Sequence, residues 1–214
     1  TKLKNIDLGS GRKIEICNAF IKDKDLNHNT IKNAAEKLKA EGAKVFVASE
    51  AFGVDDMSAE KAIYDVTKGE MGMETSIASD ITKLYGLTRR TRTAAINASI
   101  LPKMLNTANQ TEQSVRGAGV KVPLMIMRGD GGVMEINEMK KRPVLTMLSG
   151  PAASVMGSLM YLRASNGVYF EVGGTTTNIG VIKNGRPAID YSVVGGHRTY
   201  ITSLDVRVLG VAGG

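Results

Sequence analysis

The sequence predicts an α/β protein, because helical segments alternate with short apolar strand-like runs along most of its 214 residues. Between residues 30 and 41, apolar residues recur at the spacing of an amphipathic helix, and Gly42 ends it before the strand-like run KVFVAS. From residue 168 onward, alternating apolar residues and two turn signals predict antiparallel strands. We therefore expect an α/β part over residues 1–150, followed by a strand-rich start to another sheet within residues 151–214.

The elements between these regions are predicted from periodicity and from helix breakers. They are a helix from an N-cap at Ser58 to Gly69, a strand in METSIAS, a long helix or kinked pair from Leu87 to about Val115, strands in VKVPLMIM and PVLTML around the short helix NEMKKR, and a helix opened by Pro151. In the long helix, Arg90, Thr93 and Asn97 share one face. This polar stripe either orders a neighbouring loop, meets a carboxylate, or faces solvent.

The composition is that of a globular protein, with 43% hydrophobic residues, 23% charged residues and a formal net charge of +7. Only 5% of the residues are aromatic and none is Trp, which disfavours a base-stacking surface for nucleic acid. No apolar run approaches the roughly 20 residues that span a bilayer. We expect neither nucleic acid nor a membrane as a partner. Since no export signal opens the sequence, we expect a cytoplasmic protein, with its single cysteine, Cys17, buried in a strand.

The stretch YFEVGGTTTNIGVI, residues 169–182, has the features of a hairpin whose turn can hold a phosphate. Gly173 and Gly174 let backbone N–H groups converge on an anion without a Cβ clash, and hydroxyl groups at Thr175, Thr176 and Thr177 add donors. Glu171, just before the turn, can hold a magnesium ion through water. A hairpin with a flexible turn explains the same residues, and the Asn-Gly pair at 184–185 needs no function beyond a second turn.

Two further loops follow predicted strands. In IMRGDGGVM, Asp130 with Gly131 and Gly132 can face a metal or a polar substrate, because ligands of α/β sheets lie beyond the carboxyl ends of strands. A turn rich in Asp and Gly is the alternative. In LSGPAAS, small residues open a helix, which suits either an anion at the helix N-terminus or close packing against a sheet.

Four segments in this order resemble the hydantoinase A/oxoprolinase family: RTRTAAINA, IMRGDGGVM, RPVLTMLSGPAASVMG and VYFEVGGTTTNIGVI. The closing SLDVRVLGVAGG resembles a later glycine motif of the same family. The resemblance implies a partial actin-like/sugar-kinase-like (ribonuclease H-like) ATPase fold, with residues 1–150 as the α/β part of a first lobe and residues 151–214 as the start of a second lobe. It also implies ATP and magnesium as cofactors, Asp130 and Glu171 as catalytic residues, and Gly131, Gly132 and residues 173–177 as nucleotide-binding residues.

The activity that the resemblance implies is ATP-dependent opening of a cyclic amide of the hydantoin or 5-oxoproline type, by phosphorylation of the amide oxygen. It also implies a second hydantoinase-type subunit and an oligomer. We interpret the chain as a fragment of a longer protein, because no D-x-G-G-T hairpin is found in residues 1–30. We expect this fragment to be inactive alone.

The family hairpin resembles F-D-x-G-G-T-[ST]-T-D, and this sequence departs from it. Glu171 stands for the first Asp, Asn178 for the second, and Ser154 for a glycine after the paired alanines. These departures favour an alternative, a non-catalytic or regulatory ATPase-fold protein of the reactivating-factor kind. An acetone-carboxylase-like subunit is a further alternative.

Overall fold

The computed structural model describes residues 2–9, 11–163 and 165–210. The chain forms two compact units. Unit 1 comprises Thr1–Asn109 and Val193–Tyr200, and unit 2 comprises Gln110–Ser192 and Ile201–Gly214. The mixed α/β class expected from the sequence is confirmed. The expected boundary between two lobes near residue 150 stays a prediction.

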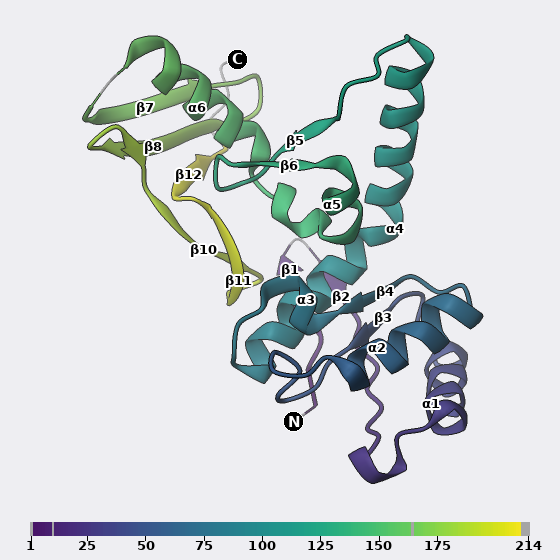
Figure 1. Ribbon diagram of the computed structural model, residues 1–214. Coiled ribbons are helices and arrows are strands. Elements are labelled where there is room, and N and C mark those ends of the chain that lie inside the picture. The colour runs from purple at the N-terminus through teal and green to yellow at the C-terminus, as the bar shows by residue number, and fades with distance from the viewer. Residues whose placement is uncertain (1, 10, 164, 211–214) are drawn as a thin grey trace. The chain divides into compact units, whose positions relative to one another are not determined.

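Unit 1 is built on a strand–helix–strand motif. Strands β3 (Phe46–Ala48) and β4 (Thr75–Ile77) are parallel, and helix α2 (Ser58–Tyr64) lies between them in the chain. Helix α1 (His28–Ala40) precedes β3 and begins at a capping box formed by Asn27 and Thr30 (Figure 1). The predicted helix over residues 30–41 and the strands in KVFVAS and METSIAS are therefore confirmed.

The helix expected from Ser58 to Gly69 differs from the prediction at its first residue and in its second half. Ser58 is the first helical residue and not the N-cap, since its N–H and hydroxyl donate to Asp56 at 2.9 and 3.0 Å. These two hydrogen bonds hold the pKa of Asp56 below its usual value. The α-helical part ends at Tyr64, and a π-helical turn over Asp65–Glu70 completes the segment. A short helix, α3 (Ala78–Thr82), follows β4.

Helix α4 (Leu87–Gly117) is a single helix that contains Pro102. Its polar stripe, Arg90, Thr93 and Asn97, is fully buried, so the solvent-facing alternative is wrong. Arg90 donates to the backbone carbonyls of Glu50, Ala51 and Leu84, which orders the loops that contain them. Asn97 donates to the Ser76 hydroxyl of β4, and Thr93 accepts from the Tyr200 backbone N–H.

The N-terminal hairpin of unit 1 is shorter than the sequence predicts. Strands β1 (Ile6–Gly9) and β2 (Arg12–Ile14) are antiparallel, and Gly9 and Gly11 have φ of +80° and +74° at the turn. Beyond Ile14 the chain runs without a strand partner as far as residue 22. Cys17 lies in this segment and is exposed, so its predicted burial in a strand is wrong.

Unit 2 begins with strands β5 (Met125–Met127) and β6 (Val133–Glu135), an antiparallel pair, followed by helix α5 (Ile136–Lys141). The predicted strand in PVLTML is wrong, because Pro143–Thr146 forms a 3-10 helix. Pro143 has no N–H to give to a sheet and its φ suits a first helical position. The Thr146 hydroxyl donates to the Pro143 carbonyl at 2.7 Å, which stabilises the turn.

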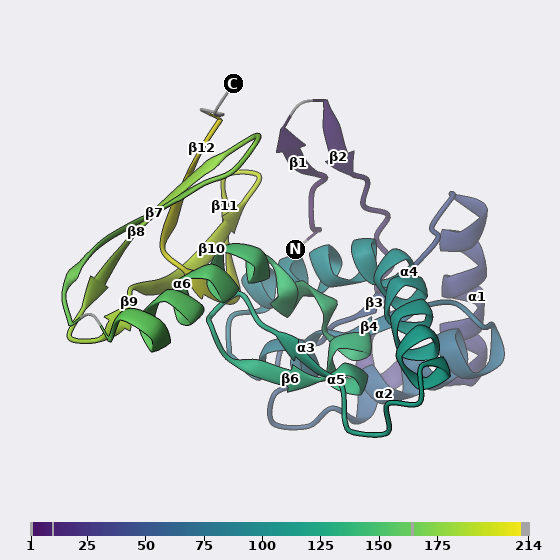
Figure 2. The same cartoon turned by 90° about the horizontal axis from the view of Figure 1, so that it is seen from above.

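The main sheet of unit 2 has the strand order β12–β8–β7, with β9 paired to β8. Its bounds are β7 (Gly167–Val172), β8 (Thr177–Lys183), β9 (Arg186–Pro187) and β12 (Val206–Leu209). Helix α6 (Ser149–Leu162), opened by Pro151 as predicted, runs along one face of this sheet (Figures 1 and 2). The core beside α6 contains Ala152, Val155 and Leu204, with Met127, Leu159, Tyr169 and Val206 around it.

The hairpin predicted over residues 168–193 is confirmed. Strands β7 and β8 are antiparallel, with residues 173–176 as the first turn and Asn184–Gly185, both at positive φ, as the second. Strands β10 (Ile189–Val194) and β11 (His197–Leu204) form a separate two-stranded sheet. No helix within residues 2–9, 11–163 and 165–210 combines the length and apolar character that crossing a membrane requires.

Candidate functional site

The β7–β8 hairpin places Glu171 directly opposite Asn178. The Asn178 side-chain amide donates to Glu171 Oε2 at 3.0 Å, and the Ser154 hydroxyl of α6 donates to Oε1 at 2.8 Å. Each carboxylate oxygen thus accepts one hydrogen bond from a neutral donor and keeps a lone pair for another partner. Asn178 is buried and Glu171 is half-buried, so the carboxylate is held in one orientation at the sheet surface.

Glu171 and Asn178 are the positions at which the hairpin departs from the family pattern, and Ser154 is the departure in the segment with the paired alanines. The structure brings all three together in one hydrogen-bonded cluster. The Glu171 side chain, one methylene longer than that of Asp, reaches the Ser154 hydroxyl. A glycine at position 154 would have no hydroxyl to donate. Asn178 supplies a donor where a second carboxylate would repel Glu171. The departures therefore form one coupled arrangement that carries a single negative charge.

The turn after Glu171 is open to solvent. The Gly173 N–H donates to the Thr176 carbonyl at 2.9 Å, which closes the turn. Gly174 has no heavy atom within 4 Å of an added Cβ, and its φ is not positive. Neither packing nor backbone conformation thus requires a glycine at 174. In the described part of the chain, the N–H groups of Gly174 and Thr175 have no acceptor, so they are available to an anion.

The three threonines do not all face this turn. Thr175 is exposed in the turn, and Thr176 is half-buried with its carbonyl bonded to Gly173. Thr177 pairs with Val172 in the first register position of β8. Side chains alternate along a strand, so Thr177 lies on the sheet face opposite Glu171 and Asn178.

The Asp130 loop joins β5 to β6, and the Asp130 carboxylate accepts hydrogen bonds from within the loop and from β11. Oδ2 accepts from Arg128 at 2.5 Å and from the Thr202 hydroxyl at 3.2 Å, and Oδ1 accepts from the Gly132 N–H at 3.1 Å. Gly131 has φ of +85°, and an added Cβ would lie 3.0 Å from the Met156 sulfur. The turn interpretation accounts for these contacts, while catalysis by Asp130 and nucleotide binding by Gly131 and Gly132 stay predictions.

Both loops contact helix α6. The hairpin does so through Glu171 and Ser154, and the Asp130 loop through Gly131 and Met156. Residues two apart in an α-helix point about 200° apart, so Ser154 and Met156 lie on nearly opposite sides of α6. We therefore expect α6 to lie between the loops.

The sequence model of the hydantoinase/oxoprolinase family matches residues 90–214, which include the Asp130 loop, α6 and the whole hairpin. The chain belongs to this family. The last residues of its closing glycine motif, 211–214, lie outside the described residues.

Two curated relatives and two solved structures show how widely this family resemblance extends. An uncharacterised protein of Methanocaldococcus jannaschii is 27% identical over 176 residues, 79% of this chain and 26% of the relative. The acetophenone carboxylase gamma subunit of Aromatoleum aromaticum is 23% identical, over 99% of this chain and 30% of that subunit. This family member therefore spans less than a third of the length of either relative.

The solved structures share the fold. A nucleotide-free acetone carboxylase, described in connection with ATP-dependent acetone carboxylation, matches 87% of this chain and 27% of its own with a TM-score of 0.73 and 20% identity. The ATP-dependent caprolactamase of Pseudomonas jessenii matches 94% of this chain and 30% of its own with a TM-score of 0.70 and 21% identity. At these identities the likeness establishes the fold of the family member and leaves its substrate open.

Substituting Asn178 by Asp tests whether the hairpin accepts a metal ion. The new carboxylate would face Glu171 across the strands, and we expect a loss of about 1–3 kcal/mol in the free energy of unfolding without divalent ions. Millimolar Mg²⁺ should recover most of this loss by binding between the carboxylates. The measurement is chemical denaturation with and without Mg²⁺. Asn137→Asp is the matched control, since exposed Asn137 donates to Glu135. A loss that Mg²⁺ does not reverse would contradict a metal at this position.

Proposed function

We propose that this chain carries a phosphate-binding hairpin of an ATP-dependent enzyme that acts on an amide or a ketone. The observation that carries the proposal is the turn at Gly174 and Thr175, whose two N–H groups have no acceptor among the described residues. A phosphate can accept from both N–H groups, and Gly174 lets it approach without meeting a side chain. Family membership and the ATP-dependent relatives support the same reading.

In this proposal Glu171 faces a magnesium ion that accompanies the nucleotide. Its carboxylate is oriented by Ser154 and Asn178, and each oxygen retains a lone pair for a metal-bound water. The ion supplies neutralisation of phosphate charge when it is bound. Asp130 is proposed as a second acid of the site, held in place by Arg128 and Thr202. The wider architecture is proposed to be that of an actin-like ATPase.

Cyclic amides of the hydantoin or 5-oxoproline type are the leading substrate class. The caprolactamase, a relative in structure, is named for a cyclic amide. A carboxylase role with a partner subunit is supported by the match to a gamma subunit. The cluster around Glu171 favours a third candidate, a regulatory nucleotide-binding protein, because Asn178 leaves the hairpin with one acid and no second charge for a metal.

The proposal is tested by titrating Mg·ATP into the 214-residue chain by calorimetry. Gly174→Val should weaken binding roughly tenfold or more, because its side chain blocks a charge-assisted hydrogen bond worth about 1.5–3 kcal/mol. Stability should change by less than about 0.5 kcal/mol, since the site is open. Gly167→Val, at the other end of β7 and equally open, is the control. Equal affinity in both variants would exclude this turn as the phosphate site.

A further inference from the structure

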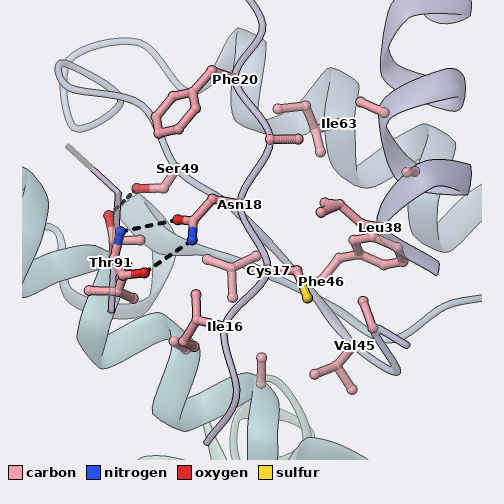
Figure 3. Close-up of a pocket in the computed structure, with 18 of the residues that line it drawn as sticks. Ile16, Cys17, Asn18, Phe20, Leu38, Val45, Phe46, Ser49, Ile63 and Thr91 are labelled. Carbon is pink, nitrogen blue, oxygen red and sulfur yellow. Dashed lines mark hydrogen bonds between the residues drawn. The ribbon is translucent and has the colours of Figure 1, made fainter. Parts of the chain in front are cut away.

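Unit 1 contains a cavity of about 620 Å³, within the range of small-molecule sites. We name it the Cys17 pocket; it is bordered by residues 13–21, by α1, by β3 with the loop after it, and by the first turns of α4. Figure 3 shows Leu38, Val45 and Phe46 around the Cys17 sulfur, and the Phe20 ring near the Ser49 hydroxyl. One end of the pocket is thus apolar, and the other carries polar groups and an aromatic ring.

The Ser49–Thr91 hydroxyl pair at the polar end offers a hydrogen-bond acceptor. The Thr91 hydroxyl donates to the Leu87 carbonyl at 2.8 Å, and this bond uses its single proton. The Ser49 and Thr91 hydroxyls lie 2.6 Å apart, and when Thr91 donates to Leu87, Ser49 is the donor in that pair. The Ser49 oxygen is left with lone pairs only. A ligand group that meets this oxygen has to donate a proton.

Glu50, next to Ser49, places a carboxylate at the pocket, and this carboxylate has no hydrogen-bond partner among the described residues. Its backbone N–H donates to Glu60 and its carbonyl accepts from Arg90, but within residues 2–9, 11–163 and 165–210 nothing donates to its side chain. The other charged residues that line the pocket are all exposed, whereas Glu50 is half-buried. Burial raises the pKa of Glu50, and the nearby negative charges of Asp23, Glu60 and Asp56 raise it further. The positive charge of Arg90 lowers it.

The surroundings of Glu50 are therefore negative, although the chain as a whole carries +7. Such a site attracts a positively charged group. An ammonium group has three donors, enough for the carboxylate and the Ser49 oxygen together. Phe20 adds a ring face suited to a cation.

We propose that the Cys17 pocket binds a small organic cation, an amine on an apolar stem, with its ammonium group at Glu50 and Ser49 and its stem toward Cys17. This site lies within unit 1, whereas Glu171 and Gly174 lie in unit 2. The inference is thus independent of the phosphate hairpin and goes beyond the proposed function.

The test uses n-hexylamine, 1-hexanol and hexanoate as probes of equal stem length and different charge. Calorimetry on the full chain should show hexylamine binding at least tenfold tighter than hexanol, and no binding of hexanoate. Affinity should rise roughly fourfold for each methylene from butylamine to hexylamine as the stem is buried. Hexanol binding as tightly as hexylamine, or no hexylamine binding at all, overturns the proposal.

Two further measurements locate the site. Glu50→Gln should weaken hexylamine roughly tenfold or more, while Glu41→Gln, at an exposed acid that also lines the pocket, should leave it within about twofold. Hexylamine should also slow alkylation of Cys17, the single cysteine, by iodoacetamide. An unchanged affinity in Glu50→Gln, or binding without protection of Cys17, places the amine elsewhere and contradicts the proposal. If Glu50→Gln does not fold, the probe series and Cys17 protection decide.

Discussion

Substituting Gly129 by Ala should lower the free energy of unfolding by about 3–5 kcal/mol. An added Cβ would lie 1.8 Å from the Met147 carbonyl oxygen, a backbone atom that cannot rotate away. The same glycine donates to the Leu145 carbonyl and accepts from the Leu204 N–H, both at 2.8 Å. Relieving the clash must therefore separate the Asp130 loop from two segments of unit 2. Chemical denaturation followed by circular dichroism measures the loss.

The matched control is Gly150→Ala, in the first turn of α6, where an added Cβ meets nothing within 4 Å. This change should be neutral or stabilise the helix by up to about 1 kcal/mol. Equal stability of the two variants would show that the Asp130 loop does not pack against Met147 as the structure describes.

Substituting Glu60 by Gln should cost about 2–4 kcal/mol. Glu60 is fully buried on α2, and its carboxylate accepts from the Glu50 N–H at 2.9 Å and from the Ser79 N–H and hydroxyl at 3.0 and 3.1 Å. Glu50 follows β3 and Ser79 follows β4, so one carboxylate joins the ends of both parallel strands. The glutamine side chain would turn an N–H₂ group toward donors and leave at least one of them unpaired.

Hydrogen exchange of the amides of Glu50 and Ser79 is the sharpest readout, since the Glu60→Gln change should speed exchange at one of them by roughly tenfold or more. Glu36→Gln, at an exposed position of α1, should leave both rates unchanged. Unaltered protection in the Glu60 variant would contradict the role of this carboxylate as the link between the strands.

The parts of the fold predicted from sequence are those set by local chemistry. The spacing of Ile31, Ala34, Ala35 and Leu38 determines α1, and Asn184–Gly185 determines the second hairpin turn. The predictions are wrong where a proline or a long-range contact overrides the local sequence pattern. Pro143 converts an apolar run into a 3-10 helix, and Cys17 is exposed because the segment after Ile14 finds no partner strand.

The candidate site was only partly predictable. Glu171 and the turn glycines were identified from the sequence, but the pairing of Glu171 with Asn178 was not, because it requires the turn to include residue 176. The contact with Ser154 depends on how α6 packs on the sheet, which no local pattern reports. The role of Glu60 was not predicted, because the local sequence around an acid on a short helix does not indicate a hydrogen bond to distant Ser79.

The central claim is that the turn after β7 binds phosphate. The most direct measurement is the shift of backbone amide resonances in the ¹⁵N-labelled chain as Mg·ADP or inorganic pyrophosphate is added. The account predicts saturable shifts at Gly174 and Thr175, with the Asn184–Gly185 turn at the other end of β8 unaffected. Shifts that occur elsewhere and leave Gly174 and Thr175 unchanged at saturation would contradict it.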